Sequence, residues 1–299
     1  MTTIAPNDAT SATGMIPLDT NAFIGAYPFR HVPHPDPEIL VRVLAREGIR
    51  RAWVGHLPSA FWRDPSHGNE ILFAALAPHR DVLLPAPSIR PDWPGWERRL
   101  ADAVSQGAPA IRAYPAQWGM GPGDPAMGRL AVACGEAGAT LVLTVKFEDL
   151  RQRHQMDVAG DLTGAHLRAI ARASQARILV TAAGRELIEE THWGLTPDER
   201  SRLFWDISWI WGPPEDHLAT LLRTIGPDRF TYGTMWPLRL TQTPAANLAL
   251  LPDDLRGTRL ADLAVDDLLP SAAGVPATRA GRKVERQNTD HPMKSETAG

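Results

Sequence analysis

Residues 109–146 read PAIRAYPAQWGMGPGDPAMGRLAVACGEAGATLVLTVK, which is an apolar run, an amphipathic stretch and a second apolar run. The runs at 109–114 and 139–146 have the length and composition of buried strands. The stretch at 124–138 begins with Asp-Pro and ends with glycine, which are start and stop signals of a helix. Because strands joined through a helix pair in parallel, this stretch predicts a β-α-β unit.

The same alternation continues on both sides of this unit. Apolar runs of strand length lie at 16–25, 50–56, 82–89, 109–114, 139–146, 177–183, 203–208 and 230–234. Amphipathic stretches with helical spacing lie at 36–48, 93–107, 124–138, 163–174 and 213–226. Eight parallel strands in one chain of 299 residues favour the α/β class and a (β/α)8 TIM barrel, formed as a single domain by residues 15–265. No glycine-rich phosphate-binding turn follows the first run, which weighs against a Rossmann fold.

Composition limits the class of partner. The chain has a hydrophobic content of 43%, a formal net charge of −3 and a pI near 6.4, and its Lys and Arg residues are spread along its length. This charge does not favour a nucleic acid or an anionic membrane as partner. Cys134 is the single cysteine, which excludes an intrachain disulfide and a cysteine-based zinc site. Its apolar neighbours predict a position in the core.

The sequence also gives expectations for location and for the chain ends. No apolar run reaches membrane-spanning length, and residues 1–14 lack the apolar segment of a signal peptide. We therefore expect a cytoplasmic protein with no membrane partner, and the sequence leaves a homo-oligomer open. Residues 1–14 and 270–299 lack apolar periodicity, and we expect both to be flexible.

Polar residues close the first two predicted strands. Asp19 and Asn21 stand two apart in the first run, so their side chains point to the same side of the strand. His56 ends the second run. In a (β/α)8 barrel the carboxyl ends of the strands carry the functional residues. Asp19 and His56 are therefore candidates for acid–base catalysis and Asn21 for substrate binding. The alternatives are hydrogen bonds of Asp19 and Asn21 to barrel backbone and Arg30, and an ordinary loop position for His56.

Later strands end in further candidates. Arg112 and Tyr114 close the fourth run, and Arg112 needs a buried carboxylate such as Asp19 or Glu148, or an anionic substrate. Lys146 and Asp206 are catalytic candidates at the fifth and seventh strands. Trp236, with other tryptophans, is a candidate wall of a substrate pocket. The alternatives are a solvated loop at Lys146, structural pairing of Asp206, and tryptophans that only pack the loops together.

Three segments resemble the amidohydrolase superfamily, in particular its amidohydrolase-related (family 2) branch. They are PLDTNAFIGAYPF at 17–29, IRAYPAQWGMGPGDPAMGRLAVACGEAG at 111–138, and FTYGTMWPL at 230–238. The resemblance implies a metal-dependent TIM barrel that activates water for hydrolysis, or assists decarboxylation or hydration. It also implies a His-x-His pair on the first strand, one histidine each on the fifth and sixth, and an aspartate at the end of the eighth.

This chain departs from that pattern at every one of these positions. Asp19 and Asn21 stand at the histidine pair, and no histidine follows the fifth strand before residue 154. Thr181 and Ala182 stand at the sixth strand, and Met235 replaces the final aspartate. Methionine suits neither zinc nor magnesium. We therefore expect a degenerate metal site, with no metal and no other cofactor. A His-x-x-His pair at 31–34 lies in a proline-containing loop and is a weak metal motif.

The sequence leaves three functions open. The first is a metal-independent hydrolase or lyase that acts by acid–base chemistry on a small carboxylate or carbonyl compound. The second is a metal-dependent hydrolase whose ligands lie elsewhere. The third is a non-catalytic barrel that binds a ligand. Charged residues at the strand ends favour an enzyme with a small-molecule substrate. No G-x-S-x-G motif supports nucleophilic acyl transfer.

Overall fold

The computed structural model describes residues 15–33 and 36–263. All eight predicted strands are present and all pair in parallel. Most are shorter than the apolar runs that predicted them, because the runs continue into the loops at the strand ends. The strands are β1 (Ile16–Ile24), β2 (Ile49–His56), β3 (Leu83–Pro85), β4 (Ala110–Ala113), β5 (Thr140–Thr144), β6 (Ile178–Thr181), β7 (Leu203–Asp206) and β8 (Phe230–Thr231).

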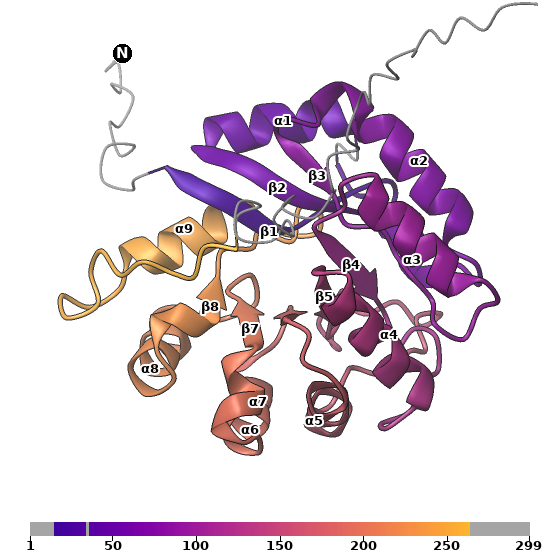
Figure 1. The fold of residues 1–299 in the computed structure, drawn as a ribbon. Coiled ribbons are helices and arrows are strands. Elements are labelled where there is room, and N and C mark those ends of the chain that lie inside the picture. Colours follow the sequence, from indigo (N-terminus) through magenta and orange to yellow (C-terminus); the bar gives the residue numbers. More distant parts are fainter. Residues whose placement is uncertain (1–14, 34–35, 264–299) are drawn as a thin grey trace, which may run out of the picture. The chain divides into compact units, whose positions relative to one another are not determined.

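Helices lie around the strands (Figure 1). The five predicted helices are α1 (Pro37–Arg46), α3 (Trp96–Ser105), α4 (Pro125–Glu136), α5 (Gly164–Ala173) and α8 (His217–Thr224). Others connect the remaining strands or follow the last: α2 (Ser66–Leu76), α6 (Arg185–Trp193), α7 (Pro197–Ser201) and α9 (Gln242–Ala249). Three 3-10 turns complete the described elements: η1 (Leu57–Phe61), η2 (Ala77–His79) and η3 (Pro227–Arg229). Within the described residues no helix is both long and apolar enough to cross a membrane.

Two seams close the strands into a barrel. Regular ladders run from β1 to β3 and from β4 to β8. A bridge between Ser88 and Arg112 joins the end of β3 to β4, and a bridge between Ala22 and Trp236 joins β1 to the segment after β8. Backbone hydrogen bonds support both seams, including Arg112 N–H to Pro87 O at 2.8 Å and Phe23 N–H to Trp236 O at 2.8 Å. The predicted (β/α)8 barrel is confirmed.

The sequence signals around α4 show why this segment forms a helix. The Asp124 side chain accepts a hydrogen bond from Ala126 N–H at 2.9 Å, and Pro125 occupies the first turn, where its missing N–H is not needed. Cys134 is buried on the inner face of the helix, as predicted. Gly138, after the helix, has a φ of 68°, a left-handed conformation that glycine adopts without steric cost.

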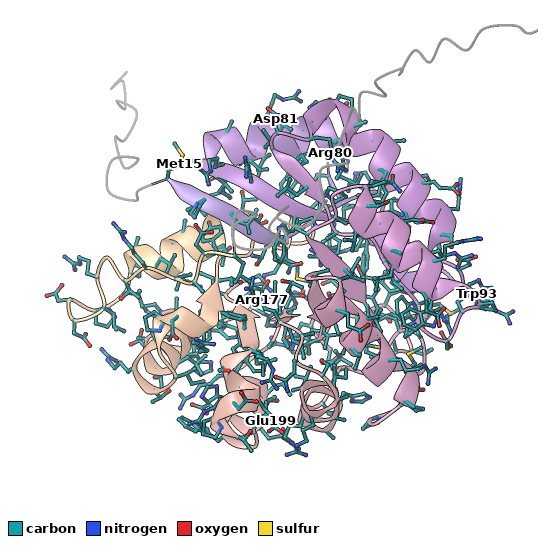
Figure 2. The ribbon with its side chains drawn as sticks, in the orientation of Figure 1. Met15, Arg80, Asp81, Trp93, Arg177 and Glu199 are labelled. Atoms are coloured by element: carbon teal, nitrogen blue, oxygen red, sulfur yellow. The ribbon has the colours of Figure 1, made fainter. Side chains whose placement is uncertain are left out.

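The barrel interior is apolar at one end and polar at the other. Leu263 packs into an apolar cluster with the inward-facing residues Leu18, Trp53, Ala86, Ala110, Val142 and Leu179. The chain is held there by a 2.7 Å hydrogen bond from Ala261 N–H to Phe230 O. Two residues further along three of these strands, on the same face, stand Arg112, Thr144 and Thr181. The polar end is therefore the carboxyl end of the strands. Side chains fill the space between strands and helices (Figure 2).

Two predictions concern residues that the structure does not describe. They are the flexible ends at 1–14 and 270–299, and the end of the domain at residue 265.

Candidate functional site

Four polar side chains from three strands meet at the carboxyl end of the barrel. Asp19, Asn21, Arg112 and Asp206 are each 0% exposed. The Asn21 amide is the centre of the group. Its Nδ2 donates to Asp206 Oδ2 at 2.8 Å, and its Oδ1 accepts from Arg112 Nη1 at 3.1 Å. Asn21 therefore links the buried arginine to the buried aspartate.

Asp19 is held by the segment that follows β8. Its Oδ1 accepts from the N–H groups of Asn21 and Thr234, both at 3.0 Å. The Thr234 hydroxyl donates to Asp19 Oδ2 at 2.6 Å. Three donors thus fix the carboxylate in the buried mouth of the barrel. The alternative of hydrogen bonds to barrel backbone is therefore present for Asp19, whereas its second part, a contact with Arg30, is wrong, because Arg30 pairs with Glu148 at 2.6 Å.

Arg112 fills the barrel interior and has no direct ion pair with another described residue. Its Nη2 donates weakly to Thr20 O at 3.4 Å, and its guanidinium lies 4.3 Å from the centre of the Phe23 ring. Its buried Nε has no hydrogen-bond partner among the described residues. The prediction that Arg112 pairs directly with Asp19 or Glu148 is wrong. The Asn21 amide stands between the guanidinium and Asp206, because an amide both donates and accepts.

Gly55 makes room for Arg112. A Cβ atom at residue 55 would lie 2.8 Å from both Cδ and Nε of Arg112, which is closer than nonbonded atoms approach. We expect Gly55→Ala to lower the free energy of unfolding by about 1–3 kcal/mol, as overpacking of a core does. Chemical denaturation measures this. Gly121→Ala is the matched control, because a Cβ at residue 121 meets no atom within 4 Å. Equal stability of the two variants would contradict the close packing at Arg112.

Burial dominates the electrostatics of the group. Loss of hydration raises the pKa of Asp19 to about 6, against the hydrogen bonds from Thr234 and Asn21 that lower it. The pKa of Asp206 is also raised by burial, although Arg112 and its hydrogen-bond donors oppose this. Burial lowers the pKa of Arg112. Asp19 is therefore a carboxyl whose protonation can change close to neutral pH.

The raised pKa of Asp19 predicts a pH dependence of stability. Because the folded-state pKa of about 6 exceeds the ordinary value of 3.8, the folded protein holds this proton more tightly than the unfolded chain. Stability contributed by the protonated carboxyl is full below pH 4 and is lost as the pH rises to about 6. We expect the loss to be up to about 1.4 kcal/mol per pH unit in that window.

His56 changes the stability in the opposite direction as the pH rises, since burial lowers its pKa to about 4. The measurement is therefore the difference in unfolding free energy between the native chain and Asp19→Asn across pH 4–7. This difference should decrease as the pH rises and then level off. A difference that is constant with pH would show that the Asp19 pKa is not raised.

Two non-glycine residues beside the group have left-handed backbones. Ala182, after β6, has a φ of 59° and donates its N–H to Asp206 Oδ1 at 2.9 Å. Met235, after β8, has a φ of 58° and donates its N–H to Asn21 O at 2.7 Å. Such conformations cost roughly 1–2 kcal/mol each in an L-residue. The Ala182 N–H thus binds a carboxylate of the group, and the Met235 N–H binds the backbone of β1 beside it. The resemblance implies metal ligands at the ends of these same two strands.

Two cations share one indole at the mouth. Lys146 Nζ lies 5.0 Å from the Trp209 ring centre, and the Arg239 guanidinium lies 4.3 Å from it. The buried Arg239 Nε has no hydrogen-bond partner within the described part of the chain. Burial lowers the pKa of Arg239, and the charges of Asp206, Glu148 and Asp149 raise it. Lys146 therefore does not touch Asp19 or Asp206 but belongs to an outer cationic pair.

Tyr114 and Trp236 are buried around the group. The Tyr114 ring packs edge-on against Trp118 at 5.5 Å and in a tilted arrangement against Phe147 at 5.6 Å. Burial raises the pKa of Tyr114, while neighbouring Arg112 lowers it. Trp236 contributes through its backbone, since its N–H donates to Thr234 Oγ1 at 3.2 Å. Both residues therefore support the walls of the site.

His56 lies apart from the group. Its Nδ1 is 2.8 Å from Ser59 Oγ, and its ring meets Trp62 edge-on at 5.2 Å. It packs tightly against Gly25 and Gly68, where a Cβ would lie 3.1 Å and 2.6 Å from its ring atoms. With a pKa of about 4, the imidazole is neutral at pH 7. No hydrogen bond between described residues joins it to Asp19, Arg112 or Asp206.

The residues at the mouth do not fit a divalent metal. Asn21 Oδ1, a potential ligand oxygen, accepts from a guanidinium, and that guanidinium supplies the positive charge of the group. In residues 15–33 and 36–263, no three His, Cys, Asp or Glu side chains come together as a metal site. Of the weak pair at 31–34, His34 lies outside the described residues.

Sequence reasoning missed Thr234 and Arg239. Thr234 stands in the run at 230–234, and its hydroxyl and backbone N–H both bind Asp19. The substitution of Met235 for an aspartate drew attention away from Thr234, although a hydroxyl at the end of an inner strand is itself a signal. Arg239 stands two residues after Pro237, in the loop over the barrel mouth. An isolated arginine in a loop gives no periodic pattern, so its contact with Trp209 required the structure.

Solved structures share this fold at low sequence identity. An amidohydrolase II matches with a TM-score of 0.62 and 13% identity, over 84% of this chain and 99% of that chain. The 2,6-dihydroxybenzoate decarboxylase from Rhizobium matches with a TM-score of 0.56 and 12% identity, over 81% of this chain and 94% of that chain. The 5-carboxyvanillate decarboxylase from Sphingomonas paucimobilis matches with a TM-score of 0.59 and 11% identity, over 81% and 96%.

No protein-family model matches the sequence, and the comparison with curated proteins gives no match. The expected likeness to amidohydrolases is therefore confirmed at the level of the fold.

Proposed function

We propose that this protein is a metal-independent hydrolase or lyase that acts by acid–base chemistry on a small carboxylate compound. The observation that carries the proposal is the buried group of Asp19, Asn21, Arg112 and Asp206 at the carboxyl end of the barrel. Buried charge of this kind is costly to a fold, and it lies where (β/α)8 barrels hold their active sites. In a barrel that served only as a scaffold, apolar residues of similar volume would fill the same space.

Asp19 is the proposed proton-transfer residue. Its pKa of about 6 means that the carboxylate is largely ionised at pH 7 yet accepts a proton readily. Thr234 and Asn21 hold it in one orientation through three hydrogen bonds. Arg112 offers a fixed, buried positive charge, which suits charge that develops on a substrate oxygen.

An anionic substrate agrees with the outer cations. Lys146 and Arg239 lie over the same ring of Trp209, and two cations at one place repel each other unless an anion joins them. A carboxylate bound by these two residues would point the rest of the molecule toward Asp206, whose charge already acts on Arg239. The two decarboxylases of similar fold are named for carboxylated aromatic compounds.

Access to the group requires movement at the mouth. Asp19, Arg112 and Asp206 are 0% exposed, so a substrate reaches them only when the covering side chains move aside. Trp209, which carries the two cations, is 6% exposed. An anion that binds Lys146 and Arg239 would compete with this cation–ring contact. Substrate binding and opening of the mouth are then the same event.

Removal of an outer cation is expected to weaken substrate binding more than it slows the chemical step. We expect Lys146→Met to raise KM for a carboxylate substrate by about tenfold, the effect of one lost charge-assisted hydrogen bond, with a smaller change in kcat. Arg151→Met is the matched control, because Arg151 is exposed in the same loop and pairs with Asp149. A loss confined to kcat would place Lys146 in the chemistry instead.

The substrate can be found by incubation of the purified protein, with a chelator present, with a panel of small aromatic and aliphatic carboxylates. Proton NMR detects any consumption, and Asp19→Asn serves as the inactive reference. Consumption that requires Asp19 supports the proposal. The absence of any Asp19-dependent turnover across this panel would favour a ligand-binding barrel.

A further inference from the structure

A hollow lies at the opposite end of the barrel from the candidate site. It has a volume of about 340 Å³ and is lined by His192, Trp193, Pro197, Arg200, Ser201, Thr224, Ile225 and Arg229. These residues belong to the last turns of α6 and α8, to α7 and to the turn before β8. Glu199 on α7 marks this region in Figure 2. The helix ends place it at the amino end of the strands.

One of the two guanidinium groups in this hollow, that of Arg200, has no paired carboxylate among the described residues. Arg200 lies over the Trp193 ring at 5.3 Å and forms no ion pair or hydrogen bond through its side chain with the other described residues. The carboxylates beside it in the chain are engaged elsewhere. Asp198 pairs with Arg202 at 2.5 Å, and Glu199 caps α7 through Thr196 N–H at 2.8 Å. Arg200 thus presents a free guanidinium to the hollow.

Arg229 adds a second guanidinium that is already oriented. It pairs with the exposed Asp228 at 2.7 Å, donates to Ser201 O, and lies over the Phe204 ring at 5.0 Å. These contacts fix the side chain in place. A fixed guanidinium loses little freedom when it binds an anion.

His192 supplies an unused hydrogen-bonding group. Its ring is 5% exposed, packs edge-on against Trp193 at 4.8 Å, and lines the hollow. Its buried Nδ1 has no hydrogen-bond partner in the part of the chain that the structure describes. A buried nitrogen without a partner is costly unless a ligand or water binds it. The candidate catalytic group at the other end of the barrel uses none of these three residues.

We propose that this hollow is a second binding site for a small oxyanion, a carboxylate or a phosphate group. Arg200 and Arg229 bind the oxygen atoms, as guanidinium groups do with planar or tetrahedral oxyanions. His192 donates to a further oxygen, and the half-exposed Trp193 closes one side. The site is independent of the proposed catalytic function.

The test is a calorimetric titration of the full chain with inorganic phosphate and, separately, with acetate. We expect one saturable anion site per chain at this hollow, apart from any acetate that binds Lys146 and Arg239, and the tighter of the two anions assigns the ligand class. Arg200→Gln should weaken binding by about tenfold, because it removes one charge-assisted contact. His192→Phe, which keeps a ring but removes the nitrogen, should also weaken it.

Arg129→Gln is the matched control, since Arg129 is an exposed arginine of α4, away from the hollow. It should leave the affinity unchanged. Heat that does not saturate with either anion would overturn the proposal. Unchanged anion affinity in both Arg200→Gln and His192→Phe would also overturn it. So would an equal loss of affinity in Arg129→Gln.

Discussion

Asp19→Asn is expected to lower kcat by about 10²–10⁴-fold, the usual contribution of a positioned acid–base group. The amide has the shape of the carboxyl but cannot exchange a proton near neutral pH. Its oxygen can accept from the Asn21 and Thr234 N–H groups, as Asp19 Oδ1 does at 3.0 Å. Its nitrogen can donate to Thr234 Oγ1, which now binds Asp19 Oδ2. The fold should therefore persist.

The measurement pairs steady-state kinetics with thermal unfolding. We expect the unfolding free energy at pH 7 to change by about 1 kcal/mol or less, because the hydrogen bonds are replaced and an ionised buried group is removed. Asp81→Asn is the matched control, since Asp81 is an exposed aspartate before β3 (Figure 2). Turnover by Asp19→Asn at the native rate would exclude Asp19 from the chemistry.

Arg112→Met is expected to destabilise the protein by about 3–5 kcal/mol, as loss of one partner from a buried charged network does. Methionine fills much of the volume beside Gly55 and Phe23, so the loss is electrostatic rather than a cavity effect. It leaves Asn21 Oδ1 without its donor and removes the charge that acts on Asp206. The melting temperature should fall by roughly 10 °C.

A second substitution separates this effect from misfolding. Asp206→Asn removes the buried carboxylate that Asn21 links to Arg112, and the Arg112→Met/Asp206→Asn protein should recover part of the lost stability. We expect a coupling energy of at least about 1 kcal/mol between the two positions, as in other contacting networks. Independent, additive effects would show that Arg112 and Asp206 do not form one network through Asn21.

The fold followed from the sequence because its signals are local. The alternation of apolar runs and amphipathic stretches predicted all eight strands, and capping signals such as Asp124-Pro125 placed the start of α4. The run at 230–234 predicted a full strand, but β8 covers only Phe230–Thr231. Its later residues leave the ladder because Thr234 turns to bind Asp19 and Met235 adopts a left-handed backbone.

The candidate site could be predicted from the sequence only in part. The rule for strand ends selected Asp19, Asn21, Arg112 and Asp206, which the structure brings together. It also selected His56 and Lys146, which end their strands but turn to Ser59 and Trp209. Strand position fixes where a side chain starts, whereas its final contacts depend on the loops. Arg239 reaches Trp209 from such a loop, which no pattern in the sequence predicts.

The central claim is that the buried group of Asp19, Asn21, Arg112 and Asp206 acts without a metal ion. The most direct test is elemental analysis of the purified protein before and after treatment with a chelator, with turnover measured on the same samples. We predict well below one transition metal per chain and equal turnover in both samples. About one zinc or manganese per chain, removed by the chelator together with activity, would contradict the claim and favour a metal-dependent hydrolase.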